Sequence, residues 1–256
     1  MRLNLNRYLP WFVFLLALLA WELLVSIYQI PHYILPSPRL IGVTLIQNFE
    51  SLAPAWWFTV KITFGALGLS VISGLLLASL FVLSPWIERS FLPFAIILQV
   101  TPIVAIAPLI LIYIDSTTGA LLLCAWIVAF FPIMSNTVIG LRATDKNLRD
   151  LFRLYKATRW QTLRLLLMPS ASPYFLAGLK IAGGLSLIGA VVAEFTAGAA
   201  GRETGLASRI LEASFRTETP KMFAALVLVS LTGVAIFSLL NQLSVFFLEH
   251  WHDSEI

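Results

Sequence analysis

The sequence predicts an all-α protein that crosses a membrane about six times. Hydrophobic residues make up 59% of the 256 residues, charged residues only 12%, and the mean hydropathy is +0.89. A soluble domain needs a charged surface and usually carries roughly twice this charged fraction. Lipid covering most of the protein explains the shortage. Apolar runs of about 20 residues, the length at which a helix crosses a bilayer, recur along the chain.

Each apolar run predicts a membrane-spanning helix, because a backbone in hydrocarbon must satisfy its own hydrogen bonds. The first run, 8–28, contains one charge, Glu22. It is longer than the apolar part of a signal peptide and lacks a clear cleavage site, so a retained helix is expected. Run 62–83 is uncharged, and run 90–141 contains only Asp115, within the turn "IDSTTG". This turn divides the longer run into spans three and four.

The remaining two spans are 174–197 and 222–248, of which the second is uncharged. Lys180 lies near one end of span five and can extend its ammonium group to the interface. Glu194 follows 14 residues later, about 21 Å along a helix, and so approaches the opposite surface. Contact with a transported substrate and a structural pair explain Glu194 equally well. Apolar residues between 40 and 46 predict a further helix resting on the outer interface.

Positive charge gathers between spans four and five. Seven of the 17 lysines and arginines lie there: Arg142, Lys146, Arg149, Arg153, Lys156, Arg159 and Arg164. Because basic loops stay on the cytoplasmic side, this segment and both termini are predicted to be cytoplasmic, in a multi-pass protein of the inner (plasma) membrane. Setting this orientation would by itself account for the cluster.

The spacing of these basic residues also predicts an amphipathic helix, because they recur every three or four positions from 142 to 156. Apolar residues fall largely on the opposite stripe: Leu148, Leu151, Leu154 and Tyr155. Such a helix can lie on the anionic inner leaflet or insert its apolar edge into a groove on a partner protein. Pro169 and Pro173 then predict the end of a second short helix and the start of span five.

Two prolines, Pro102 and Pro108, interrupt span three within "QVTPIVAIAP". Prolines kink membrane helices and free backbone carbonyls, so neighbouring polar groups are candidates to line a pathway. Polar groups of spans four and five are added to these. The candidate pathway residues are Gln99, Thr101, Pro102, Ser135, Asn136 and Glu194. The small residues of "AGGLSLIGAVVAE" in span five are expected to permit close helix packing.

From Asp150 onward, the basic segment resembles the "EAA" loop of binding-protein-dependent ABC transporter permeases. The loop's pattern is Glu-Ala-Ala, three residues, Gly, nine residues, Ile, one residue, Leu-Pro. Here the matching positions are Asp150, Leu151, Phe152, Lys156, Leu166, Met168 and Pro169. The stretches "ATRWQTLRLLLMPSASPYFLAGLKIAGGLSLIGAVVAEF", "ILPSPRLIGVTLIQNF" and "VTPIVAIAPLILIY" are similar to the nitrate/sulfonate/taurine branch. The resemblance therefore covers nearly the whole chain.

This resemblance implies one permease domain, 1–256, with a type I importer fold and a coupling segment at 142–172. The segment would insert a helix into a groove on a cytoplasmic ATPase. The implied coupling residues are Asp150, Leu151, Phe152, Leu154, Tyr155, Lys156, Ala157, Arg159 and Pro169. Lys156 replaces the glycine of the pattern, which predicts either a more continuous helix or a different turn.

The implied partners are two ATPase subunits, a second permease copy forming a homodimer, an extracytoplasmic binding protein and membrane lipid. ATP would be used by the ATPase, and no cofactor would be bound by this chain. Members of the branch import nitrate, sulfonates or taurine, and relatives take up pyrimidine vitamin precursors or riboflavin. The implied cargo is thus a small polar solute of one of these kinds.

Other functional classes of protein find less support in the sequence. There is no Gly-x-x-x-x-Gly-Lys-Ser/Thr loop to hold a phosphate, and His32, His250 and His252 lack the spacing of a metal site. One cysteine, Cys124, excludes an intramolecular disulfide. A secondary transporter would favour internal repeats and midplane charges, and an intramembrane enzyme would need a catalytic motif. The net charge of +4 is concentrated in one loop, so nucleic acid is not expected. Co-purification with an ATPase distinguishes a permease from the other two classes.

Overall fold

The computed structural model describes residues 5–202 and 205–248, and every regular element in these ranges is helical. In chain order the elements are α1 (Leu5–Ile27), α2 (Pro38–Gln47), α3 (Phe49–Leu83), α4 (Pro85–Val100), α5 (Ile103–Tyr113), α6 (Thr117–Ala143), α7 (Lys146–Leu154), α8 (Arg159–Thr162), the π-helical turn η1 (Leu163–Leu167), α9 (Met168–Ala199), α10 (Leu206–Phe215) and α11 (Thr219–Leu248). The predicted cytoplasmic ends of the chain, with His250 and His252, lie outside the described residues.

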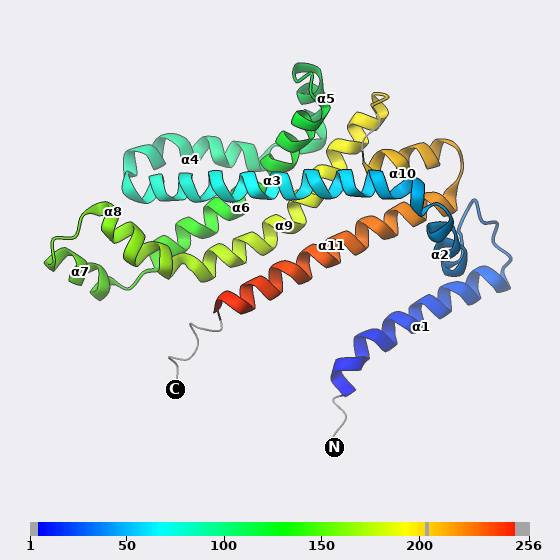
Figure 1. Cartoon of the computed structure of the whole chain (residues 1–256), viewed down its shortest axis with the longest axis horizontal. Helices are drawn as coiled ribbons and strands as arrows, with labels where there is room; N and C mark the ends of the chain where they lie inside the picture. Colours follow the sequence, from blue (N-terminus) through cyan, green and yellow to red (C-terminus); the bar gives the residue numbers. More distant parts are fainter. Residues whose placement is uncertain (1–4, 203–204, 249–256) are drawn as a thin grey trace.

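The number of spans agrees with the prediction. Five helical segments are long and apolar enough to cross a membrane, and α4 with α5 makes a sixth if this bent pair counts as one span. The long helices run side by side in an elongated bundle, and α1 lies at its edge (Figure 1). The ring of Trp21 in α1 packs against Phe223 of α11, with 6.0 Å between the ring centroids.

Close packing of α9 against α6 forms the centre of the bundle, and glycines allow it. A Cβ atom at Gly189 would lie 2.8 Å from the Cα atom of Ala125, and one at Gly178 would lie 2.8 Å from the carbonyl oxygen of Pro132. Neither position has room for a larger residue. The packing role predicted for small residues of span five is thus confirmed at Gly189. Gly184, by contrast, has open space around it.

Span three differs from the expected kinked helix, because it is broken into two helices. The axes of α4 and α5 are bent by 102° at Thr101 and Pro102. Thr101 is extended (φ −67°, ψ 122°), the conformation that a following proline ring favours. Pro102 also lacks the amide hydrogen needed to continue the helix. Pro108, in contrast, lies inside α5 without ending it.

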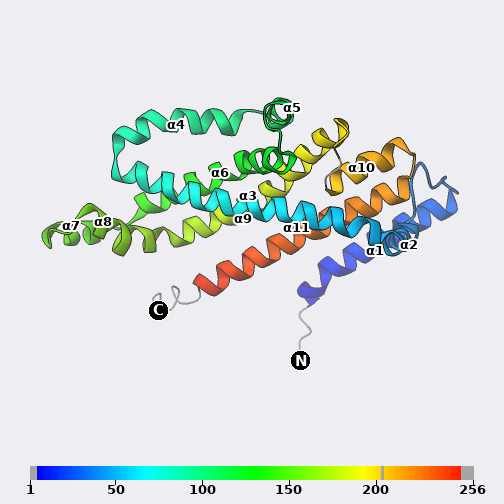
Figure 2. The ribbon, with the colours of Figure 1, turned by 45° about the horizontal axis from the view of Figure 1, so that its top comes forward.

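The bundle has two distinct ends (Figure 1). At one end, called here the α7 end, α7 and α8 lie beyond the turn between α3 and α4; α4 returns alongside α3 from this turn (Figure 2). At the other, the α10 end, lie α2 and α10. The predicted helix at 40–46 is confirmed as α2, whose first turn is capped by the side chain of Ser37 accepting from the amide of Leu40.

Candidate functional site

The predicted coupling segment, 142–172, contains α7, a short helix whose start is fixed by its cap. The carboxylate of Asp145 accepts hydrogen bonds from the amides of Asn147 (2.6 Å) and Leu148 (3.4 Å), which helices otherwise leave unpaired. No residue of α7 is buried. The helix therefore stands at the end of the bundle with most of its surface free.

The two predicted stripes of α7 have different surroundings. On the apolar stripe, Leu151 is 44% exposed, Leu154 79% and Tyr155 80%. On the basic stripe, Arg149 is directed to the bundle, where Nη2 donates to the carbonyl oxygen of Leu141 over 2.6 Å. The apolar side of α7 is thus exposed to solvent, and on the basic side Arg149 contacts the bundle while Arg153 is 81% exposed.

Lys156, at the position of the pattern's glycine, lies in a turn, so the alternative of a more continuous helix is wrong. The helix ends at Leu154, and Lys156 has a positive φ of 51°. The amide of Lys156 donates to the carbonyl of Arg153 (2.9 Å), and the amide of Ala157 donates to that of Phe152 (3.0 Å). This pair of bonds is the Schellman motif. A non-glycine residue is strained in this conformation by roughly 1 kcal/mol or more.

After this turn the chain enters one long helix, and the predicted break at Pro169 is wrong. Thr158 and Gln161 form a capping box at the start of α8, and helical structure then continues from Arg159 to Ala199. The wider π-helical turn η1 comes directly before α9, and Pro169 falls in the first turn of α9, where a proline ring is tolerated. Span five and α8 are therefore mechanically continuous.

The remaining coupling residues lie around the same turn. The carboxylate of Asp150 pairs with Arg153 at 3.2 Å, on the exposed side of α7. Phe152 packs against the apolar cluster beneath the segment, and Ala157 lines a cleft next to it. Arg159 donates from Nη1 to the carbonyl of Leu83 at the end of α3 (3.4 Å).

Three of the candidate pathway residues meet at the break in span three. Gln99, Thr101 and Pro102 line a cavity of about 350 Å³ together with residues of α6 and α9, among them Pro132 and Leu185. The broken backbone thus faces a space inside the membrane-spanning part of the protein. Irregular backbone at this depth is tolerated where it is buried in protein or lines a cavity.

Ser135 and Asn136 lie one turn after Pro132 in α6 and are not among the residues that line this cavity. Their side chains donate to the carbonyl of Pro132, over 3.4 Å from Ser135 and 2.8 Å from Asn136. Pro132 does line the cavity, so these two side chains bond to a residue of its wall.

Glu194 is placed apart from the cavity, near the α10 end. Its side chain is fully buried; one carboxylate oxygen, Oε2, accepts from the hydroxyl of Thr59 (3.1 Å) and from the amide of Ala207 (3.1 Å). The hydroxyl oxygen of Thr59 in turn accepts from the amide of Leu206 (2.9 Å). A Cβ atom at Gly205 would collide with both side chains. Glu194 therefore ties the first turn of α10 to α9 and α3, with Thr59 as a partner that no sequence pattern indicated.

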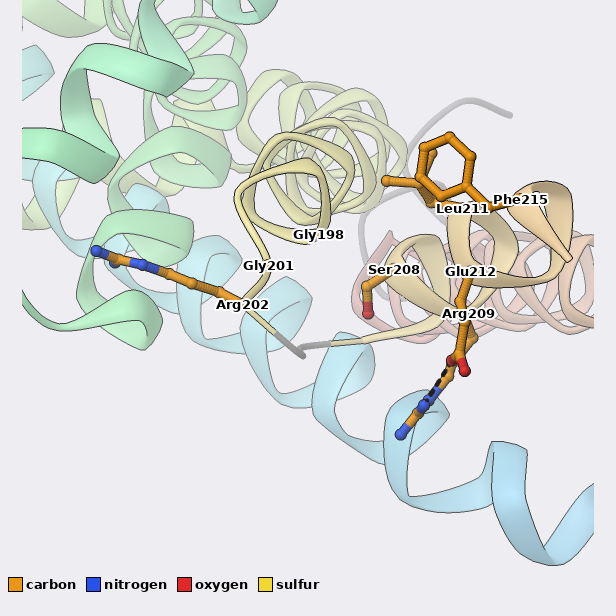
Figure 3. A pocket seen from close by; sticks show the side chains of 8 residues that line it. All are labelled: Gly198, Gly201, Arg202, Ser208, Arg209, Leu211, Glu212 and Phe215. Atoms are coloured by element: carbon orange, nitrogen blue, oxygen red, sulfur yellow. Dashed lines mark hydrogen bonds and ion pairs between the residues drawn. The ribbon is translucent and has the colours of Figure 1, made fainter.

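A second hollow lies at the α10 end, where Figure 3 shows its lining residues. It has a volume of about 290 Å³ between the last turn of α9 and α10. Glu212 accepts from Arg209 over 2.7 Å and also pairs with Arg216 at 2.9 Å. The bond from Arg209 lowers the pKa of Glu212. Arg202 extends away from α10 to the hydroxyl of Thr117, 3.3 Å away (Figure 3).

Residues 66–250 match the family described as "Binding-protein-dependent transport system inner membrane component". This range contains the broken span, the cavity and the coupling segment. The chain belongs to this family. It is a permease component of a binding-protein-dependent ABC importer, which is a transport subunit rather than an enzyme.

Curated relatives of the permease are named for different transported solutes. It is 33% identical to the formylaminopyrimidine transport permease protein ThiX of Halalkalibacterium halodurans, over 91% of this chain and 92% of the relative. It is also 33% identical to the riboflavin transport system permease protein RibX of Chloroflexus aurantiacus, over 90% and 87%. A putative aliphatic sulfonates permease, SsuC of Bacillus subtilis, is 26% identical over 83% and 76%.

A solved structure supports the fold. The permease superimposes on a chain from the crystal structure of an amino acid ABC transporter with a TM-score of 0.64. The match covers 79% of this chain and 96% of that chain at 18% identity. The predicted all-α importer fold is confirmed.

Proposed function

We propose that this permease translocates a small polar solute without ionised groups, of the pyrimidine-precursor or riboflavin kind, delivered by an extracytoplasmic binding protein. The cavity at the break in span three carries this proposal. Its polar side chains are the amide of Gln99 and the hydroxyl of Thr101, and no charged residue is among its lining residues.

The neutral lining favours an uncharged cargo for an energetic reason. Moving an ion out of water is costly unless charges or several hydrogen bonds receive it. A nitrate or sulfonate ion would meet one amide and one hydroxyl here, whereas a neutral heterocycle needs donors and acceptors of this kind along an apolar wall. Two relatives whose names specify such heterocycles are also 33% identical to this chain.

The rest of the assembly is proposed from the family and from the two ends of the bundle. The exposed apolar side of α7 docks in a groove on a cytoplasmic ATPase, so the α7 end and both termini are cytoplasmic. The binding protein meets the α10 end. A second copy of the permease faces the cavity and completes the pathway. ATP binding closes the ATPase pair and, through α8 and the continuous span five, reopens the pathway toward the binding protein.

Matched substitutions can test the role of the cavity. Gln99→Leu and Thr101→Val remove the two polar groups with little change in size. Gln242→Leu, at an exposed position of α11, and Thr196→Val control for the loss of an amide and a hydroxyl. Thr196 is a well-matched control for Thr101. Each hydroxyl donates to the carbonyl four residues before it, over 3.1 Å at Thr196 and 2.7 Å at Thr101.

Uptake is measured in proteoliposomes that contain the permease, its ATPase and its binding protein, with formylaminopyrimidine, riboflavin, taurine and nitrate as candidate solutes. We expect uptake of a neutral heterocycle to fall at least tenfold in the cavity variants and to stay normal in the controls. Normal uptake in both cavity variants would remove Gln99 and Thr101 from the pathway. Uptake of nitrate or taurine alone would contradict the proposed class of cargo.

A further inference from the structure

A third cavity lies at the α7 end, between the coupling segment and the turn that joins α3 to α4. It is a cleft of about 420 Å³. Val82, Leu83 and Pro85 from that turn form one apolar wall. Three arginines of the coupling segment form the opposite side: Arg149, Arg153 and Arg159. One cleft thus combines an apolar wall with a concentration of positive charge.

The hydrogen bonds of these arginines leave donors unused. Arg149 donates from Nη2 to the carbonyl of Leu141, and its buried Nε has no partner among the described residues. Arg159 makes one long bond, 3.4 Å, to a backbone carbonyl. The carboxylate of Asp150 pairs with Arg153 alone, at 3.2 Å. Among the described residues, one of the three guanidinium groups is thus paired with a carboxylate, which leaves a net charge of about +2 at the cleft. Guanidinium groups bind phosphate oxygens through parallel N–H bonds.

The position of the cleft indicates the level of a membrane surface. It is bounded by the end of α3 at Leu83 and the start of α4 at Pro85, where two spans turn back. Trp86 is 76% exposed beside this turn, and Trp160 is 63% exposed in α8. Tryptophan is enriched at the interface between hydrocarbon and water, where its ring lies among lipid headgroups. A ligand in this cleft would therefore lie at the depth of a phospholipid phosphate.

We propose that this cleft binds the headgroup of an anionic phospholipid. The phosphate would lie between Arg149, Arg153 and Arg159, and the glycerol and first acyl carbons would lie along the wall formed by Val82, Leu83 and Pro85. The bound lipid would supply the negative charge that the protein does not provide here. The site uses the basic side of α7 and leaves the apolar side free, so a lipid and a docked ATPase can bind the same helix together.

The test measures lipid retained by the complete permease–ATPase complex. The complex is purified in detergent, mixed with phosphatidylglycerol or with phosphatidylcholine, and examined by native mass spectrometry. Arg149→Gln, Arg153→Gln and Arg159→Gln are made singly and together. Lys146→Gln is the matched control, because it removes the same charge from the same helix outside the cleft.

We expect selective retention of phosphatidylglycerol by the wild-type complex. Each arginine removed should weaken retention about fivefold, the effect of one basic residue near an anionic membrane surface. The Lys146 control should retain the lipid. Arg153→Gln alone keeps the test valid if the triple variant does not fold. The Arg153 side chain is 81% exposed, and its partner among the described residues is the carboxylate of Asp150 on the same helix.

Several results would overturn the proposal. Equal retention of both lipids would mean that no anionic headgroup is recognised. Unchanged retention in the triple variant would place the lipid elsewhere. Displacement of phosphatidylglycerol by millimolar inorganic phosphate would show a site for free phosphate. Retention only when the ATPase is absent would show that the cleft is a protein contact. None of these results depends on the cargo of the permease.

Discussion

The apolar side of α7 offers the sharpest test of docking. Leu151→Asp combined with Tyr155→Asp places two carboxylates on the exposed stripe and leaves the arginines in place. Leu151 is 44% exposed and Tyr155 80%, and neither is buried against the bundle. The double variant should therefore fold and insert into the membrane as the wild type does.

The expected loss follows from the surface that docking would cover. Full burial of a large apolar side chain contributes about 1.5–3 kcal/mol. Because Leu151 is already half covered, docking adds about 1 kcal/mol there, and about 2 kcal/mol at the more exposed Tyr155. A total of about 3 kcal/mol corresponds to roughly a 150-fold weaker complex at each helix. Two carboxylates without partners in the groove would weaken it further.

The assay compares the ratio of ATPase to permease after affinity purification, together with solute uptake. The double variant should purify without its ATPase and should not transport. Phe215→Asp is the control, because Phe215 is 78% exposed at the α10 end. It introduces one carboxylate at an exposed apolar position without touching α7 and should keep the normal ratio. A double variant that retains the ATPase at the wild-type ratio would refute docking through this stripe.

Three other predictions follow from particular contacts. Lys156→Gly should relieve the strained turn and stabilise the end of α7 by about 1 kcal/mol, seen as slower amide hydrogen exchange there; faster exchange would contradict the strain. Thr59→Val should lower stability in detergent by about 1–3 kcal/mol, because it leaves the buried amide of Leu206 without its partner and removes one of the two hydrogen bonds to Glu194. Thr63→Val, which removes only a bond within α3, should cost less, and equal losses would contradict this role of Thr59. A cysteine at position 158 should react with an impermeant reagent only after the inner membrane face is opened; labelling in intact cells would reverse the proposed orientation.

The spans were predictable because one property decides them. A helix surrounded by lipid needs predominantly uncharged side chains over about 20 residues, and this requirement appears directly in the composition of the runs. The break at Thr101 was only partly predictable. Pro102 indicated a disturbance, but a proline produces anything from a slight kink to a complete break. Contacts of α4 and α5 with distant helices decide the result, and these contacts are not local in sequence.

In the predicted coupling segment, too, some features could be predicted from the sequence and others could not. Periodicity predicted both stripes of α7, because residues three or four apart share a side of a helix. It did not indicate which stripe would be directed to the bundle. The break expected at Pro169 failed because the rule describes proline inside a regular α-helix, whereas here a π-helical turn comes first. The turn at Lys156 forms without the glycine of the sequence pattern, since backbone hydrogen bonds and not the side chain define it.

Glu194 illustrates a limit of reading charge from sequence. A lone carboxylate in a span indicates a function or a structural pair, and the sequence offers no means to choose. Its partners are the hydroxyl of Thr59, 135 positions away, and an amide at the start of α10. Neither is an ionisable group, so no search for opposite charges would have found them.

The basic residues between 142 and 164 do not all have the same surroundings, and the structure distinguishes the contacts of Arg149 and Arg159 from those of Lys146. Arg149 and Arg159 donate to backbone carbonyls at the ends of α6 and α3, so they hold the coupling segment against two spans. Lys146 is not among the residues that line the cleft, so the proposed cytoplasmic orientation of the segment is the role that would remain for it. A movement of α7 caused by the ATPase would therefore act on α6 and α3 through these arginines, as well as on span five through α8. Since the same guanidinium groups surround the proposed lipid site, the headgroup would lie at the joint through which coupling passes.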